Sequence, residues 1–168
     1  ILFVQRRTPF EPLIHGGGQE SGRRSGTENV ASAIGMSTAL RSAGGSPAAT
    51  IGKRDDFIAA VLTKVPGAQL TGHPALRLPG SASFVFPGTS GEAILVELES
   101  RGIVCSSGSA CAAGSDEPSH VLTAMGYDAE TAQTAVRFTF GRSTTAAHLA
   151  AVTEDLVRAV AAVTAIGA

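Results

Sequence analysis

The sequence predicts an α/β fold in which most of the chain forms an α+β small domain, with helices packed on a mixed sheet. In the segment AVRFTFGR, Val136 and Phe138 alternate with Arg137 and Thr139, which is typical of a half-buried strand. Near the end of the chain, apolar residues recur at spacings of three and four, which predicts an amphipathic helix; they are Leu149, Val152, Leu156, Val160 and Val163. Patterns of these two kinds alternate along the chain, as they do in folds that layer helices on a sheet.

The first part of the chain predicts one strand, a loop and two helices. Residues 1–4 form an apolar run that resembles a strand, and five glycines crowd between residues 16 and 26, where no regular element is expected. Thr27 and Glu28 resemble the N-cap and acidic first turn of a helix over about 28–43. Helical spacing of apolar residues predicts a second helix over about 50–65, and short strands are expected near 68–71 and 82–86.

The next elements surround the two cysteines of the chain. Thr89 and Glu92 have the spacing of a capping box for a helix over about 90–101, and Gly102 suits the position after its last turn. Ile103 and Val104 then resemble a short strand. Pro118 suits the first position of a further helix that ends at Gly126.

Composition narrows the function classes. The chain has 168 residues, which suits one core, and a net charge of -1 with no basic run, which disfavours a nucleic-acid surface. No apolar run approaches the roughly 20 residues of a membrane helix. With only two cysteines and no signal peptide, we expect a cytoplasmic, reduced protein and no membrane partner. The chain begins without methionine on an apolar run, which suggests a fragment.

The two cysteines differ in their sequence surroundings. Cys111 lies among serine, glycine and alanine, so it is expected to be exposed, either as a thiol of no consequence or as a nucleophile that transfers a group. No charged residue lies within four positions of it to lower its pKa. Cys105 is expected to pack as a small apolar residue. Their six-residue spacing does not match a zinc site, and no metal is predicted.

Two further features are compatible with anion binding. Arg137 is either a solvated strand residue or a guanidinium held in a fixed direction for a carboxylate. The glycine-rich segment HGGGQESGRRSGTEN is either a plain loop or an anion site built from backbone N–H groups, Arg23, Arg24 and the helix that opens at Thr27. The four histidines are scattered singly, and surface or capping roles are expected for them.

Three segments occur in this order along the chain: GGGQESGRRSGTENV, SSGSACAAGSDEPSHVLTAMG and VRFTFGRSTT. Taken together, they resemble the C-terminal half of a NifS/IscS-like cysteine desulfurase, a pyridoxal-phosphate enzyme of the class V aminotransferase type. The resemblance implies the C-terminal part of a fold-type I enzyme. Residues 1–27 would end the large cofactor domain with the dimer-contact loop, and residues 28–168 would form the small domain that carries the cysteine loop.

The resemblance also implies roles for three residues. Cys111 matches the nucleophile that takes sulfur from L-cysteine as a persulfide and leaves L-alanine. Arg137 matches the ligand of the substrate carboxylate. Thr27 matches the residue that reaches the phosphate of pyridoxal 5'-phosphate in the neighbouring subunit of a homodimer, and the sulfur would pass to an acceptor such as an iron–sulfur scaffold protein.

One departure from the family pattern concerns the cofactor lysine. Neither Lys53 nor Lys64, the two lysines of this chain, has the required sequence context. The isolated chain is therefore expected to be inactive without the missing N-terminal half or a partner chain. Two alternatives stay open: a non-catalytic module that carries sulfur on its thiol or binds a scaffold protein, and part of a selenocysteine lyase-like enzyme.

Overall fold

The computed structural model describes residues 1–43, 47–107 and 117–166. The chain divides into two compact units, residues 1–45 and residues 46–168. Unit 1 holds the 3-10 turn η1 (Gln19–Gly22) and the helix α1 (Val30–Ala43). All the other helices and strands that the structure describes belong to unit 2.

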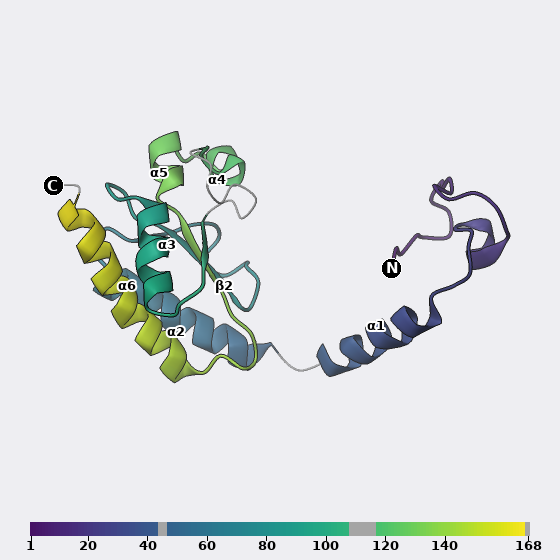
Figure 1. Cartoon of the computed structure of the whole chain (residues 1–168), viewed down its shortest axis with the longest axis horizontal. Coiled ribbons are helices and arrows are strands. Elements are labelled where there is room, and N and C mark those ends of the chain that lie inside the picture. Colours follow the sequence, from purple (N-terminus) through teal and green to yellow (C-terminus); the bar gives the residue numbers. More distant parts are fainter. Residues whose placement is uncertain (44–46, 108–116, 167–168) are drawn as a thin grey trace. The chain divides into compact units, whose positions relative to one another are not determined.

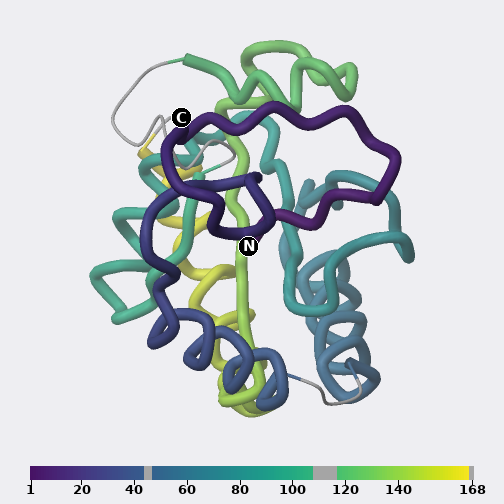
Figure 2. The backbone as a smooth tube through the Cα atoms, turned by 90° about the vertical axis from the view of Figure 1, so that its right-hand side faces the viewer, coloured from purple at the N-terminus to yellow at the C-terminus, as the bar shows by residue number. Residues whose placement is uncertain are grey.

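Unit 2 combines five helices with a four-stranded sheet in its described residues. In chain order the elements are α2 (Ala48–Lys64), β1 (Gln69–Leu70), β2 (Ser81–Val85), α3 (Gly91–Ser100), β3 (Ser106–Ser107), α4 (His120–Ala124), α5 (Ala129–Gln133), β4 (Val136–Thr139) and α6 (Ala146–Ile166). Figure 1 shows the long helices α2, α3 and α6 together, while α4 and α5 lie at one end of the unit. Figure 2 traces β4 in light green through the middle of the unit.

The sheet has the strand order β1-β2-β4-β3. Every pairing among the described strands is antiparallel, whereas a mixed sheet was expected. The reason is the position of β4. Since β2 and β3 are both antiparallel to β4, they are parallel to each other and are joined through α3, so β4 splits a β-α-β unit. That unit explains why the sequence alternates between strand and helix patterns.

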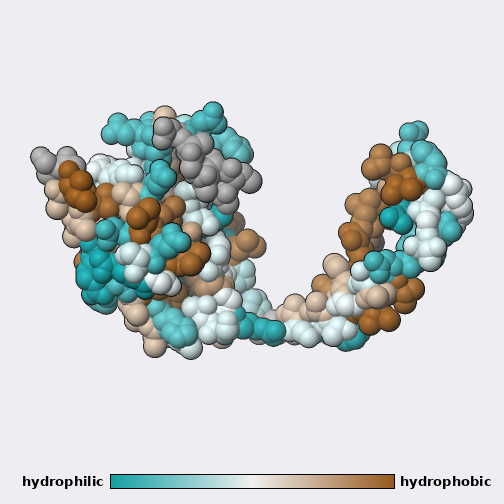
Figure 3. All heavy atoms as spheres, viewed as in Figure 1, coloured by the Kyte–Doolittle hydropathy of each residue, from teal (hydrophilic) through white to brown (hydrophobic). Residues whose placement is uncertain are grey.

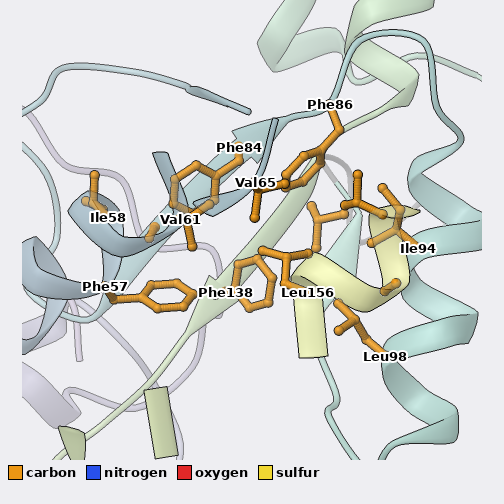
Figure 4. Close-up of a cluster of buried hydrophobic side chains, with 14 of the residues drawn as sticks. Phe57, Ile58, Val61, Val65, Phe84, Phe86, Ile94, Leu98, Phe138 and Leu156 are labelled. Atoms are coloured by element: carbon orange, nitrogen blue, oxygen red, sulfur yellow. The ribbon is translucent and has the colours of Figure 1, made fainter. Parts of the chain in front are cut away.

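One face of the sheet carries the main core of unit 2. Alternation along β2 and β4 turns Ala82, Phe84, Val136 and Phe138 toward the long helices, and all four are buried. Phe57 of α2 meets Phe138 edge to face, with the ring centroids 5.3 Å apart. Figure 4 shows these rings with Leu156 of α6 and with Ile94 and Leu98 of α3. The three long helices therefore cover this face.

Among the described residues of unit 2, the opposite face of the sheet carries a second apolar cluster at one end. Val85, which points away from the main core, packs with Leu122, Ala132 and Ala135 of the α4–α5 region in a second small cluster. Farther along the same face, β2 carries Ser81 and Ser83, and β4 carries Arg137 and Thr139. This face is therefore apolar beside α4 and α5 and polar beyond them.

Most predicted elements are confirmed with small shifts of their ends. The strand over 136–140, the helices near 28–43, 50–65 and 90–101 and the C-terminal helix are all present. Gly102 has φ +79° after α3, and the N–H of Ile103 donates to the carbonyl oxygen of Leu98 at 3.0 Å, which closes that helix end as expected.

The predicted strand over residues 1–4 is wrong. These residues have no regular structure, and Ile1 and Phe3 are 96% and 89% exposed. A strand needs a partner strand for its backbone hydrogen bonds, and none of the described strands pairs with them. The strand predicted at Ile103–Val104 is likewise misplaced, because the ladder with β4 starts at Ser106.

The predicted N-terminal ends of three helices are each misplaced by one or two residues. Asn29, not Thr27, accepts a hydrogen bond from the N–H of Ser32 at the start of α1. Ser90, not Thr89, caps α3 by accepting from the N–H of Ala93, while the Thr89 hydroxyl donates to the carbonyl oxygen of Phe86. Ser119 caps α4, so Pro118 precedes the cap. A capping side chain must be adjacent to the first turn, and the chain offers several polar residues there.

Candidate functional site

Arg137 occupies the middle of the sheet of unit 2. It lies on β4, between β2 and β3, and its neighbours Val136 and Phe138 point into the main core. Arg137 therefore points to the opposite, polar face, as its alternation with the aromatic residues predicts, and it is half-buried there. Its cross-strand neighbours are Ser83 on β2 and Ser106 on β3.

The charge of Arg137 is uncompensated within the described part of the chain. Its side chain makes no hydrogen bond or ion pair with residues 1–43, 47–107 or 117–166. By contrast, the buried Arg54 lies 2.7 Å from Asp55, and Arg101 lies 3.2 Å from Glu97. A half-buried cation without a partner is suited to bind an anion, and a guanidinium binds a carboxylate through two parallel hydrogen bonds.

Cys111, the predicted nucleophile, lies outside the described residues. The described chain stops at Ser107, the last residue of β3, and resumes at Glu117, shortly before α4. Because Ser106 is paired with Arg137, the segment that carries Cys111 starts beside the arginine. The segment that carries Cys111 is therefore connected to Arg137 by the pairing of β3 with β4.

Cys105 is a packed structural residue, as predicted. It is half-buried against the main core and is a free thiol. Burial, and to a smaller extent the nearby Glu99 carboxylate, raise the pKa of this thiol to about 11. A thiol with this pKa is almost wholly protonated at neutral pH, so Cys105 is a poor nucleophile.

The glycine-rich segment of unit 1 is closed by its own hydrogen bonds. The hydroxyl of Ser25 donates to the carbonyl oxygen of Gly17 at 2.7 Å, and the N–H of Gly26 donates to the Gln19 side chain at 3.2 Å. Gly26, next to Thr27, has φ +97°, a conformation that glycine adopts without strain. Thr27 itself is exposed.

Unit 1 also contains a cavity of about 550 Å³. Its lining combines apolar side chains with Glu20, Arg23 and Arg24. Thr27 belongs to unit 1 and Arg137 to unit 2, so the predicted site residues are distributed over both units.

Both lysines of the chain are engaged in the packing of unit 2. The ammonium group of Lys53 donates to the carbonyl oxygen of Thr144. Lys64 forms an ion pair with Glu154 at 2.5 Å, and this partner lowers the pKa of the Glu154 carboxyl group. These contacts tie α2 to the turn before α6 and to the first half of α6, which leaves structural roles for both ammonium groups.

Sequence analysis missed the serines beside Arg137. Ser83 and Ser106 are half-buried, and their hydroxyl groups have no hydrogen-bond partner among the residues that the structure describes. The alternation of Ser81 and Ser83 with Ala82 and Phe84 was a visible signal for a polar face. The pairing that brings Ser106 from a distant segment to Arg137 had no local signal.

Comparisons with known proteins agree with this architecture. The family model described as aminotransferase class-V matches residues 8–152. An IscS-like cysteine desulfurase of Mycobacterium tuberculosis is 42% identical over 165 residues, covering 95% of this chain and 42% of the relative. The cysteine desulfurase NifS of Azotobacter vinelandii is 46% identical over 149 residues, covering 86% of this chain and 37% of the relative. The chain thus spans about two fifths of the length of these relatives.

Solved structures show the same similarity. A NifS-like protein superposes with a TM-score of 0.74 at 28% identity, covering 95% of this chain and 41% of that protein. A NifS-like protein from Rickettsia africae gives a TM-score of 0.67 at 30% identity and covers 89% of this chain and 39% of its own. These neighbours confirm the predicted fold class. The chain therefore belongs to the aminotransferase class-V family, and the relatives that it matches are cysteine desulfurases.

Proposed function

We propose that this chain supplies the carboxylate-binding arginine and the sulfur-accepting thiol of a cysteine desulfurase. The observation that carries the proposal is the pairing of Ser106 with Arg137, because it joins the segment of Cys111 to an arginine that has no partner in the described chain. Five peptide units separate Ser106 from Cys111, and such a length spans at most about 18 Å. The thiol of Cys111 is thus within reach of a small substrate bound at Arg137.

Arg137 binds the α-carboxylate of L-cysteine in this proposal. Strand pairing on both sides fixes the backbone of Arg137, so the direction of its side chain is limited. The guanidinium can meet both carboxylate oxygens at once, which orients the substrate as well as holding it. Lysine, which carries a point charge, would not orient the substrate in the same way.

Cys111 accepts the sulfur. Its thiolate attacks the substrate sulfur, and an S–S bond forms while the C–S bond of the substrate breaks. The electron pair left on the substrate carbon takes up a proton, so the products are L-alanine and a persulfide on Cys111. Cys105 takes no part, because its raised pKa keeps it protonated.

Pyridoxal phosphate is the cofactor implied by the family, and its fit to this chain is partial. The exposed Thr27, beside Gly26 and close to Arg23 and Arg24, suits a ligand of the phosphate group. Since Lys53 and Lys64 are bound in unit 2, the amine that carries the cofactor comes from another part of the enzyme. When bound, the cofactor supplies an electron sink for bond breaking in the amino acid.

We keep the predicted domain boundary between residues 27 and 28 as part of the proposal, although the compact units of the structure divide at residues 45 and 46. Residues 1–27 complete a cofactor domain and contact a second subunit, and residues 28–168 form the small domain. Unit 1, which holds residues 1–27 together with α1, buries no large apolar side chain among its described residues, and Ile1, Leu13, Val30, Ile34 and Leu40 are exposed. Figure 3 shows such apolar side chains in brown on the surface of unit 1. Exposed apolar surface of this kind supports contact with another chain, in a homodimer.

Cytoplasmic iron–sulfur assembly is the proposed setting, with a scaffold protein as the sulfur acceptor. The names of the M. tuberculosis and A. vinelandii relatives support the desulfurase activity, and the acceptor rests on family resemblance alone. Within the described ranges, every helix is too short or too polar to cross a membrane.

A hybrid enzyme tests the proposal. This chain replaces the matching part of A. vinelandii NifS, and the hybrid is assayed with L-cysteine and pyridoxal phosphate for alanine and for persulfide. We expect both products, and we expect Cys111→Ala to abolish both while the cofactor absorbance stays. A hybrid that binds the cofactor but loads no sulfur on Cys111 would reject the proposal. A chain that takes sulfur from a separate donor without cofactor would instead be a sulfur carrier.

A further inference from the structure

The side chains on the polar face around Arg137 make no hydrogen bond within the described chain, and three of them are directly opposite one another. They are Ser83 on β2, Arg137 on β4 and Ser106 on β3, and they form one row across the sheet. Side chains that are directly opposite each other on neighbouring strands have Cβ atoms about 4.5–5.5 Å apart. A flexible arginine side chain can therefore lean toward either serine.

Backbone hydrogen bonds hold the Ser83 end of this row of three residues in place. The carbonyl oxygen of Ser83 accepts from both the N–H and the hydroxyl of Thr71, at 2.9 Å and 3.1 Å. The carbonyl oxygen of Thr71 accepts in turn from the guanidinium of Arg77 at 2.6 Å. The backbone of Ser83 is thus held from one side by this network and from the other by β4.

Serine is an unfavourable choice for two half-buried strand positions. Strands favour β-branched and aromatic residues, which serine is not. Every fully buried side-chain N or O atom among the described residues has a hydrogen-bond partner, so the unpartnered hydroxyl groups of Ser83 and Ser106 are accessible on the polar face and free to act when a ligand is bound. A guanidinium has five N–H groups and a carboxylate takes two of them, so three need other acceptors. The oxygens of Ser83 and Ser106 are suitably placed acceptors.

We propose that Ser83 and Ser106 are positioning residues that hold the guanidinium of Arg137 in the orientation that binds a carboxylate. This inference rests on the proposed role of Arg137 and extends it to the two neighbouring strands. Because Ser106 also begins the segment that leads to Cys111, the same contact couples the orientation of the arginine to the start of the thiol segment.

The test uses the whole 168-residue chain and a carboxylate that cannot donate sulfur. Propionate is titrated while the Nε–H signal of Arg137 is followed by NMR, and propylamine, which lacks the carboxylate, is the control ligand. We expect propionate alone to shift and sharpen this signal. Ser83→Ala and Ser106→Ala should each raise the Kd for propionate about tenfold, the size expected for one lost hydrogen bond to a charged group.

Two further variants separate positioning from a general structural effect. Ser83→Thr keeps the hydroxyl group and should keep the Kd within about twofold. Ser81→Ala removes a hydroxyl on the same strand and face, but at the position opposite Thr139, and should leave the Kd unchanged. Thermal unfolding of each variant shows that the fold is retained.

The outcomes distinguish this inference from the desulfurase activity. If propionate does not bind, or if both Ser→Ala variants bind it as the original chain does, the positioning role is overturned while the activity can still hold. Equal weakening by Ser81→Ala would also overturn it. If the hybrid enzyme forms no persulfide but the serine variants weaken propionate binding as expected, the positioning role stands and the desulfurase activity fails. In the active hybrid, the same serine variants should raise KM with kcat little changed.

Discussion

Ser106 of β3 lies directly opposite Arg137 of β4, so the strand that leads toward Cys111 is paired with the strand that holds the candidate carboxylate ligand. The two residues are 31 positions apart in the sequence (137 − 106), with α4 and α5 between them. The antiparallel sheet thus brings together parts of a site that the sequence keeps separate.

Replacing Arg137 should weaken substrate binding more than it slows the reaction. Arg137→Lys keeps a positive charge but loses the two parallel hydrogen bonds, so we expect KM for L-cysteine in the hybrid enzyme to rise about tenfold or more. An interaction made equally with substrate and transition state mainly changes KM. Steady-state kinetics measure this effect.

The matched control for Arg137 is Arg158→Lys on α6. Arg158 is exposed and forms an ion pair with Asp155, far along the chain from the candidate site. Its replacement should leave KM and kcat unchanged. Equal KM values for the Arg137→Lys variant and the original enzyme would contradict the role of Arg137.

Cys105 should make the stability of unit 2 depend on pH in the alkaline range. Its pKa rises from the usual 9.0 to about 11 in the fold, first because of burial and then because of Glu99. The unfolded chain therefore loses this proton at a lower pH than the folded chain. The contribution of the Cys105 thiol to the free energy of unfolding is therefore complete below about pH 9 and is lost as the pH rises toward 11. Urea unfolding at several pH values measures the change.

Substitution of Cys105 gives the comparison for this pH effect. Cys105→Ala should flatten the decline in the free energy of unfolding between pH 9 and 11, since it removes the titrating group. Iodoacetamide at pH 8 should also modify Cys105 slowly, as seen by fragmentation mass spectrometry of the tryptic peptide 102–137, which separates modification of Cys105 from that of Cys111. Rapid modification of Cys105 in the folded chain would show that its thiol is not protected.

Two glycines in helices should respond to alanine in opposite directions. At Gly91, the first residue of α3, a Cβ atom would lie 2.6 Å from the carbonyl oxygen of Gln133 and 2.9 Å from the carbonyl carbon of Thr134. Both are backbone atoms, so Gly91→Ala should lower the free energy of unfolding by about 1–3 kcal/mol. At Gly52 in α2 a Cβ atom would meet no atom within 4 Å outside the adjacent backbone of its own helix, and Gly52→Ala should raise the free energy of unfolding by about 0.5–1 kcal/mol.

Chemical denaturation of the two glycine variants checks this pair. The close approach at Gly91 holds the start of α3 against the end of α5, next to β4. If Gly91→Ala were as stable as Gly52→Ala, the packing of α3 against this backbone would be wrong.

Local patterns were sufficient to predict most helices and the central strand. The alternation around Arg137 gave both the strand and the direction of the arginine, because side chains on a strand must alternate between two faces. The spacing of Leu149, Leu156 and Val163 gave the buried face of α6 in the same way. Such signals depend only on neighbouring residues.

Pairings and exact ends depend on contacts that are distant in the sequence. Ile103 and Val104 resemble a strand, but Val104 is 89% exposed and the ladder with β4 begins at Ser106. Residues 1–4 also resemble a strand, but an apolar run becomes one only where a partner strand is available. The serines beside Arg137 became visible as a group only through the register of three strands.

The most direct test of the account is the mass of the tryptic peptide that contains Cys111 after the hybrid enzyme has reacted with L-cysteine. The account predicts that this peptide, residues 102–137, gains one sulfur atom and that a reducing agent removes it. Because the peptide also contains Cys105, its fragmentation in the mass spectrometer should place the added sulfur on Cys111 and none on Cys105. Production of alanine at the full rate with no sulfur on Cys111, or with Cys111→Ala in place, would contradict the central claim.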